Sequence, residues 1–461
     1  MNSQTHQRQV GRLTGRVEVD AGLLRYREMI SEREGTTANK GSLRSGHAFQ
    51  TRQIRLARVL SAFLFVLLII GVVGAAQTAV TPRVVEGALL FDNETGVDVV
   101  RIGILFDEPV TICQADILAF GGGAVTRLDA GLRTAWIDAV VVPGGTLLIN
   151  LRSNAQVASA YWVSSTEERN KVVFEWFLDV VWNQGDGAAL PEFMSSNVLV
   201  HGDSFAGGEL PGMPAFGMFA MGVATAFPDV HFTTDDIIAQ EDKVAVRITF
   251  SGTHGGPLLD IPASGNPIAG RDLIIFRFAE GKIEEAWLQL DGLGIMVQMG
   301  LIPAMGAPDF SWGPRSPATG DPGTVEENVA IALRDLLEVW NGRELSLTEE
   351  LFDDDFVGNY DLATVVGPEA YTYFISESLA TYPDYHITIR DVVAQGEFVF
   401  VRTTVSATHL GPLGPIPATG MPWTEDAIAM YRIANGKIVE AWQLIDMLSV
   451  LMQIGIVPPL Q

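Results

Sequence analysis

The most apolar stretch of the chain covers residues 59–80, and no charged residue interrupts these 22 positions. A helix of this length rises about 33 Å, which is enough to cross the hydrocarbon core of a membrane. A buried core helix normally keeps a polar face, but this segment is apolar on all sides. The pattern therefore predicts a transmembrane helix over residues 59–80. The alternative is a signal peptide cleaved near Gly74-Ala75-Ala76, because small residues suit a cleavage site.

Residues 81–163 show short runs of β-type residues that are separated by turn signals. Such runs occupy 97–106, 110–113, 134–137 and 146–151. This punctuation predicts a small antiparallel, β-sandwich-like domain. It contains no cluster of catalytic residue types, so we expect a spacer or an adhesion-like module.

The remainder of the chain is an internal repeat. Two copies are predicted, at 164–303 and 324–461, and the Pro- and Gly-rich segment 304–323 between them predicts a linker. The recurring residues lie 155 positions apart, except for one dipeptide near the start of each copy, where the offset is 158. They are Phe227-Pro228-Asp229 with Tyr382-Pro383-Asp384, His254 with His409, Trp287 with Trp442, Asp291 with Asp446, and Trp182-Asn183 with Trp340-Asn341.

Each copy is predicted to begin with a helix and to continue as strands. Ser165 with Glu168, and Thr324 with Glu327, fit the capping-box pattern, in which a hydroxyl and a carboxylate cap each other's amides. Farther along, residues 244–251 alternate in character, as a sheet with two different faces requires. Helices first and strands afterwards predict an α+β fold, with helices over one side of a curved antiparallel sheet.

Charge is distributed unevenly along the chain. The whole chain holds 30 Lys and Arg residues against 55 Asp and Glu, a net charge of −25. Residues 1–58 are basic, with eleven Lys or Arg against five acids, so we expect a cytoplasmic tail and extracytoplasmic domains after the membrane span. Signal cleavage would instead make the protein secreted. An acidic chain repels phosphate backbones, which argues against a nucleic-acid partner.

The residue types also limit the chemistry. The single cysteine, Cys113, excludes an intrachain disulfide and a cysteine-rich metal site. The histidines are scattered and no His-Glu-x-x-His pair occurs, so we expect no metal site. The sequence has no phosphate-binding loop, no dinucleotide fingerprint and no Gly-x-Ser-x-Gly elbow, and we expect no cofactor.

A succession of short motifs runs through the repeat. In the first copy these are Trp182-Asn183-x-Gly185-Asp186, Phe227-Pro228-Asp229, Gly252-Thr253-His254-x-Gly256, Ile261-Pro262-Ala263-Ser264-Gly265, Gly281-Lys282-Ile283, Glu285-x-Trp287 and Asp291. The second copy carries much of the same succession, including Ala407-Thr408-His409-x-Gly411. In this order, and twice over, the motifs resemble the SnoaL-like polyketide cyclases, which are also called ester cyclases.

The resemblance implies a ketosteroid-isomerase-like cone, in which a bent sheet is closed by helices around an apolar pocket. Members of the family usually pair through their sheets, so we expect the two cones to pair within the chain, or the chain to form a homodimer. The implied function is binding of a small apolar carbonyl compound of the polyketide type, with its cyclisation or isomerisation. The alternative is a non-catalytic module of the cell envelope that binds a ligand or supports assembly.

The position expected for the family's acid differs in both copies. The family pattern places a catalytic aspartate directly after the tryptophan of its penultimate motif, where this chain has Leu288 and Gln443. Leucine cannot carry a proton, and glutamine has no pKa near neutrality. In another register the aspartate matches Asp291 and Asp446, and whether the protein is an enzyme depends on this choice. If Leu288 faces inward, apolar groups line the cone at this strand.

Three residues are candidates for proton transfer. Asp291 and Asp446 would act as acid or base in an apolar pocket that raises their pKa, or they cap the segments that follow them. His201 differs between the copies, because its counterpart is Asn359. That difference is expected if one pocket kept its chemistry and the other lost it, and equally if a loop has drifted.

Six residues are candidates for ligand binding. Leu288 and Gln443 occupy the expected position of the family's acid. His254 and His409 end a strand, where an imidazole can polarise a carbonyl; alternatively, they hydrogen-bond the Ile-Pro-Ala loop. The first helix of each copy supplies the remaining candidates, Trp182 and Trp340.

Overall fold

The computed structural model describes residues 83–85, 88–92, 99–110, 117–120, 123–141, 146–151, 157–163, 165–258, 261–303, 312–361 and 363–458. The expected tail at 1–58 and the expected transmembrane helix at 59–80 lie outside these residues. Within the described parts of the chain, no helix is long and apolar enough to cross a membrane. All described residues belong to one compact unit, Thr78–Gln461.

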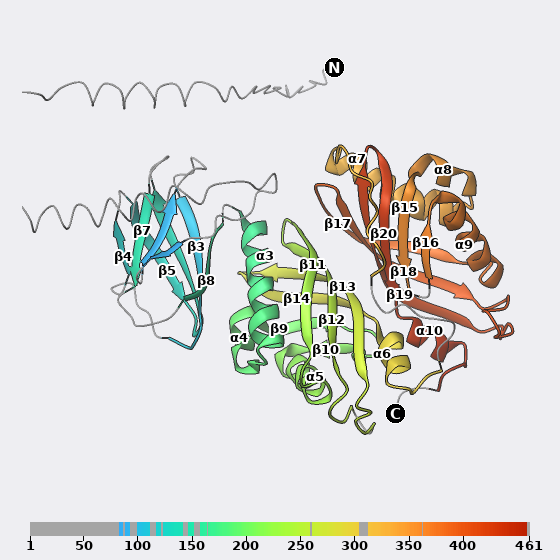
Figure 1. Ribbon diagram of the computed structural model, residues 1–461, viewed down its shortest axis with the longest axis horizontal. Helices are drawn as coiled ribbons and strands as arrows, with labels where there is room; N and C mark the ends of the chain where they lie inside the picture. The colour runs from blue at the N-terminus through green and yellow to red at the C-terminus, as the bar shows by residue number, and fades with distance from the viewer. Residues whose placement is uncertain are drawn as a thin grey trace, which may run out of the picture. The chain divides into compact units, whose positions relative to one another are not determined.

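Among the described residues before the repeat, eight strands form two four-stranded antiparallel sheets, with strand orders β1-β2-β7-β4 and β5-β6-β3-β8 (Figure 1). Three of the expected β-type runs correspond to β3, β6 and β7. The strands are β1 (Arg83–Val85), β2 (Ala88–Asp92), β3 (Val99–Phe106), β4 (Ile117–Phe120), β5 (Gly123–Ala130), β6 (Thr134–Val141), β7 (Thr146–Leu151) and β8 (Val157–Val163).

The first copy, called repeat 1 (described residues 165–303), has helices over a six-stranded sheet. Its first helix, α3 (Thr166–Phe177), continues into a π-helical turn at Leu178–Asn183. The other elements are α4 (Leu190–Phe193), β9 (Met194–His201), β10 (Glu209–Pro211), α5 (Gly212–Ala226), β11 (His231–Gln240), β12 (Lys243–Thr253), β13 (Pro267–Ala279), β14 (Lys282–Leu290) and α6 (Gly292–Gln298).

The second copy, called repeat 2 (described residues 324–458), has the same order of elements, including a π-helical turn at Asp335–Asn341. The tandem α+β fold expected from the sequence is therefore confirmed. The elements are α7 (Val325–Arg334), α8 (Thr348–Leu351), β15 (Phe352–Tyr360), β16 (Ala363–Val366), α9 (Pro368–Thr381), β17 (His386–Gln395), β18 (Phe398–Thr408), β19 (Pro422–Ala434), β20 (Lys437–Ile445) and α10 (Met447–Gln453).

The two sheets share one topology, β10-β9-β14-β13-β12-β11 in repeat 1 and β16-β15-β20-β19-β18-β17 in repeat 2. The sequence predicted antiparallel sheets, but each sheet contains one parallel pair of strands. β14 pairs with β9, and β20 with β15, in parallel. Between the paired strands the chain passes through a helix and three further long strands, and such a long crossover is what parallel pairing requires.

The helices begin at the residues that the capping patterns indicated. Glu327 N–H donates to Thr324 Oγ1 over 3.2 Å, and Thr324 N–H donates to Glu327 Oε2 over 3.2 Å, so both halves of the box are formed. In repeat 1, Glu168 N–H donates to Ser165 Oγ over 3.1 Å. Each hydroxyl thus satisfies an amide that has no partner within its own helix.

The period of two in the long strands separates the side chains into two sets. In β13 and β14, Ile274, Phe276 and Leu288 face the interior of the cone and pack with the helices. Leu273 and Ile275, one position away, belong to another apolar cluster, together with Ile428, Met430, Trp442 and Leu444 of repeat 2. Each sheet therefore has one face in its own cone and one face in this shared cluster.

Contacts between the repeats occur in reciprocal pairs. Arg247 lies over the Trp442 ring at 4.7 Å from its centroid, and Arg402 lies over the Trp287 ring at 4.7 Å. Gln395 Oε1 accepts a hydrogen bond from the Ala239 amide, and Gln240 Oε1 accepts one from the Ala394 amide. Residues that correspond by the 155-residue offset thus exchange the same contacts, as in a two-fold interface.

Candidate ligand-binding site

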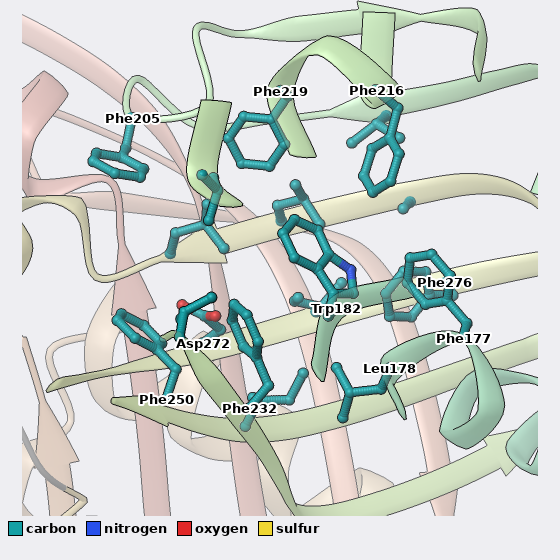
Figure 2. Close-up of a pocket in the computed structure, with 18 of the residues that line it drawn as sticks. Phe177, Leu178, Trp182, Phe205, Phe216, Phe219, Phe232, Phe250, Asp272 and Phe276 are labelled. Carbon is teal, nitrogen blue, oxygen red and sulfur yellow. The ribbon is translucent and has the colours of Figure 1, made fainter. Parts of the chain in front are cut away.

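Repeat 1 contains an aromatic cavity of about 80 Å³ between the inward side chains of its sheet and the helices α3 and α5. Figure 2 shows its lining. Among the described residues that line it, Asp272 is the only one that can ionise. The labelled residues are Phe177, Leu178, Trp182, Phe205, Phe216, Phe219, Phe232, Phe250, Asp272 and Phe276.

Asp272 stands on β13, on the same face as Ile268, Ile274 and Phe276. It is 3% exposed, and Oδ1 has no hydrogen-bond partner among the described residues. Burial raises the pKa of Asp272 well above its usual range, and the nearby charges of Asp203 and Asp291 act in the same direction. Desolvation therefore favours the protonated carboxyl. A neutral carboxyl carries one O–H that can be donated to a ligand.

Repeat 2 has a cavity of about 290 Å³ at the corresponding place, with a more polar lining. Asp361 contributes a carboxylate that accepts from Ile445 N–H over 3.2 Å, and burial raises the pKa of Asp361 to about 8. The other lining residues used below are Trp340, Phe374, Glu377, Tyr382, Tyr385, Trp423 and Gln443.

A buried hydrogen-bond network lies behind this lining. Tyr371 Oη donates to Asp335 over 3.0 Å, Tyr431 Oη donates to Asp335 over 2.9 Å, and Trp340 Nε1 donates to Tyr371 Oη over 2.9 Å. Burial raises the pKa of Asp335 to about 7, although the two tyrosine hydroxyls oppose the shift. At the corresponding positions repeat 1 has three packed aromatic rings, those of Phe177, Phe216 and Phe276.

The family model of the SnoaL-like polyketide cyclases matches residues 172–299 and 330–454. The chain belongs to this family. The resemblance recognised in the motifs is therefore confirmed, in both copies. A search of curated proteins found no match.

Solved structures with similar coordinates each correspond to one copy. AclR from Streptomyces galilaeus is 25% identical, with 30% of this chain and 87% of that chain covered and a TM-score of 0.27. TsrD from Streptomyces laurentii is 27% identical, with coverages of 29% and 96% and a TM-score of 0.26. IdmH from Streptomyces antibioticus is 26% identical, with coverages of 28% and 98% and a TM-score of 0.26.

Four of the six ligand-binding candidates line the cavities of the two SnoaL-like repeats. Trp182 and Leu288 line the cavity of repeat 1, and Trp340 and Gln443 line that of repeat 2. The Trp182 ring lies 5.2 Å from the ring of Phe232, centroid to centroid. Leu288 faces inward, the orientation for which apolar groups were expected to line the cone at this strand.

The other two ligand-binding candidates, His254 and His409, are fully buried and line none of the three cavities described here. His254 Nδ1 lies 3.0 Å from Ser264 Oγ and accepts from Ser264 N–H, and His409 Nδ1 makes the same contacts with Thr419. Burial lowers the pKa of both imidazoles. These contacts are those of the structural alternative, a hydrogen bond to the Ile-Pro-Ala loop.

Two of the catalytic candidates, Asp291 and Asp446, lie at the start of helices. Asp291 Oδ1 accepts from Gly294 N–H over 3.0 Å, and its Oδ2 lies 3.4 Å from Arg271 Nε. Asp446 Oδ1 accepts from Ser449 N–H over 2.9 Å. Neither residue lines an aromatic cavity. Both make the capping contacts that were the alternative to catalysis.

His201, the third catalytic candidate, packs parallel to Trp287 with ring centroids 5.5 Å apart, and its Nε2 lies 2.9 Å from Glu285 Oε1. It lines a polar hollow of about 250 Å³ together with Asp446 and Arg402. The structure thus brings His201 and Asp446 to one hollow, which is separate from the two aromatic cavities. Among the residues described here, no group of three or more His, Cys, Asp or Glu is arranged to hold a metal ion.

The sequence analysis did not propose several polar residues of the cavities for ligand binding, among them Asp272 in repeat 1, and Tyr382 and Trp423 in repeat 2. The alternation of side chains along the strand could have indicated Asp272, because it places this residue on the same face as Ile274 and Phe276. A carboxylate at an inward position of an apolar strand is the exception that marks a site.

The Asp335 network gives a pH-dependent contribution to stability. The pKa of Asp335 is about 7 in the folded protein and about 3.8 when exposed, so the folded state binds the proton more tightly. Stability should fall as the pH rises from about 4 to about 7, and should change no further above that. Asp335→Asn should abolish this contribution, about 2 kcal/mol between pH 5 and 7.5. Urea unfolding at several pH values measures it.

The exposed carboxylate of Glu369, on α9, offers a matched control. Glu369→Gln should keep the pH dependence of the parent protein. Identical slopes for the parent and Asp335→Asn would show that Asp335 ionises normally in the folded state.

Proposed function

We propose that repeat 1 binds a small apolar carbonyl compound, whose carbonyl oxygen accepts a hydrogen bond from the protonated carboxyl of Asp272. The supporting observation is one buried carboxyl, without a partner on Oδ1 among the described residues, in a cavity that is otherwise apolar. Leaving a buried polar group unpaired costs about 1–3 kcal/mol. A bound carbonyl removes that cost, whereas a hydrocarbon does not.

The lining also favours a neutral ligand. It contains no Lys, Arg or His among its described residues, so nothing there would compensate the charge of a carboxylate or a phosphate. The aromatic walls suit an apolar body, and the one carboxyl suits one acceptor oxygen.

Proton transfer is the second candidate function, and membership of a cyclase family favours it. Asp272 as an acid would give its proton to the carbonyl oxygen, and as a carboxylate it would take a proton from the neighbouring carbon. The described lining offers no second ionisable side chain. Both roles would therefore fall on one residue, so binding is the leading proposal and turnover the second.

Substitution of Asp272 tests the leading proposal. The parent protein should prefer 1-tetralone, a bicyclic ketone, over tetralin, which has the same skeleton without oxygen. Asp272→Leu should lower the affinity for the ketone by about 3- to 10-fold, which corresponds to one hydrogen bond, and leave the affinity for tetralin unchanged. Calorimetric titration measures both affinities.

The helix cap Thr324, which lines neither aromatic cavity, serves as the control for this test. Thr324→Ala should lower stability by about 1 kcal/mol without altering the ratio of ketone to hydrocarbon affinity. An unchanged ratio in Asp272→Leu would overturn the proposal. Deuterium exchange at the carbon next to the carbonyl, followed by NMR, reports on turnover: exchange that depends on Asp272 would favour the enzyme, and its absence the binding protein.

We also propose that residues 59–80 anchor the protein in a membrane, with the N-terminus in the cytoplasm. The absence of charge over these positions and the basic segment before them support this orientation. Protease added to intact cells should cut within 81–461 and leave 1–58 intact. The opposite pattern would reverse the orientation, and a mature chain that starts after position 76 would mean secretion.

The reciprocal contacts support a third proposal, that the two SnoaL-like repeats pair within one chain. Native mass spectrometry of the full chain, released from detergent, should then give the monomer mass of 49.8 kDa. A stable dimer mass that persists on dilution would favour pairing between chains.

A further inference from the structure

The two cavities differ at equivalent positions in a consistent direction. Four apolar residues that line the cavity of repeat 1 are replaced in repeat 2 by residues that carry a hydrogen-bond donor, and all four replacements also line the cavity. The pairs, each 155 positions apart, are Phe227 with Tyr382, Val230 with Tyr385, Ile268 with Trp423, and Leu288 with Gln443.

Two of these donors have no acceptor within the described parts of the chain. They are the hydroxyl of Tyr382 and the indole N–H of Trp423. The two residues are 7% and 4% exposed, so little water reaches them. Their rings meet edge to face, with centroids 5.3 Å apart, and both donors belong to one wall. Buried donors are normally paired, so two unpaired ones on a cavity wall indicate a ligand that accepts from them.

The buried network around Asp335, in the same repeat, contains donors that do have partners. Trp340 Nε1 donates to Tyr371 Oη, and Tyr371 donates to Asp335. These groups are satisfied without a ligand. Other buried donors of repeat 2, His409 Nε2, Asn359 Nδ2 and Trp442 Nε1, also have no partner among the described residues, but they do not line this cavity. Tyr382 and Trp423 do line it.

The remaining lining limits the charge of the ligand. No Lys, Arg or His is present among the described lining residues, which disfavours an anion. The lining has two carboxylates. Asp361 already accepts the Ile445 amide, and burial favours its neutral form, so it provides no fixed charge for a cation. Glu377 is exposed to solvent, where water screens its charge. The rings of Trp340 and Tyr385 pack 5.0 Å apart, centroid to centroid, and such aromatic walls suit a flat molecule.

We propose that repeat 2 holds a second binding site, for a flat, uncharged compound whose oxygens accept hydrogen bonds from Tyr382 and Trp423. The site differs from that of repeat 1 in its chemistry, because the position of Asp272 is taken by Ala427. It supplies neutral donors where repeat 1 supplies a carboxyl. The proposal does not depend on the role of Asp272.

Coumarin, a flat lactone with two acceptor oxygens and no donor, is a suitable probe, and naphthalene is its oxygen-free counterpart. The experiment uses the full chain with Asp272→Leu, so that the carboxyl of repeat 1 does not contribute. Tyr382→Phe and Trp423→Phe should each lower the affinity for coumarin by about 3- to 10-fold, as expected for one hydrogen bond. The affinity for naphthalene should stay the same.

Tyr371→Phe is the matched control, because it removes a hydroxyl of the same cone that is already paired and does not line the cavity. It should lower thermal stability and leave coumarin binding unchanged. Tyr382→Phe should not lower thermal stability, since its hydroxyl has no partner to lose.

Two results would overturn the proposal. One is coumarin binding that is insensitive to both Tyr382→Phe and Trp423→Phe. The other is a loss of stability in Tyr382→Phe as large as that in Tyr371→Phe, which would mean that the hydroxyl has a partner within the protein. Neither result bears on the tetralone preference, which tests repeat 1 separately.

Discussion

The structure depends on the alternation of side chains along the three long central strands of each repeat. Within β13 and β14, even-numbered residues such as Ile274 and Leu288 face the cone. Odd-numbered residues such as Ile275 join the cluster shared with the other repeat. A slip of one residue would exchange the two sets, burying Trp287 in the cone and exposing the cavity lining to the neighbouring sheet. Both apolar faces therefore hold the register, and the register decides which residues can meet a ligand.

Polar groups inside the cones fall into two kinds. Asp335 in repeat 2 accepts from two tyrosine hydroxyls, and the whole set replaces three phenylalanines of repeat 1. The three positions must be substituted together, because a buried carboxyl surrounded by phenylalanines, or a buried tyrosine hydroxyl without the carboxyl, would have no hydrogen-bond partner. Asp272, Tyr382 and Trp423 are different, since each has an unpaired polar atom within the described structure. Paired groups can be explained by packing, whereas the unpaired groups on the cavity walls are the basis of the two binding proposals.

The sequence was sufficient for the repeats, the helix caps and the family, because these rest on local patterns that recur 155 residues apart. It was insufficient for the parallel pair of strands, which depends on where a long crossover returns. It also directed attention to residues shared by both copies, such as Asp291 and Asp446, which turn out to make helix-capping contacts. Asp272 has no counterpart, since Ala427 stands in its place, so a search for recurrence passed over it. That Asp272 lines the cavity and has no partner on Oδ1 among the described residues is visible only in the structure.

The division of each sheet into two faces also explains how two copies of one fold can differ in their cavities. The lining residues at even positions of β13 and β14 make no part of the shared cluster, so Ile268 can become Trp423 without disturbing Ile275 or Ile428. Residues of the outward face have less freedom. Arg247 and Trp442 must remain complementary to each other, as must Arg402 and Trp287. A tandem arrangement of this kind keeps the contacts between the repeats constant while the two interiors diverge, one toward a single carboxyl and the other toward neutral donors.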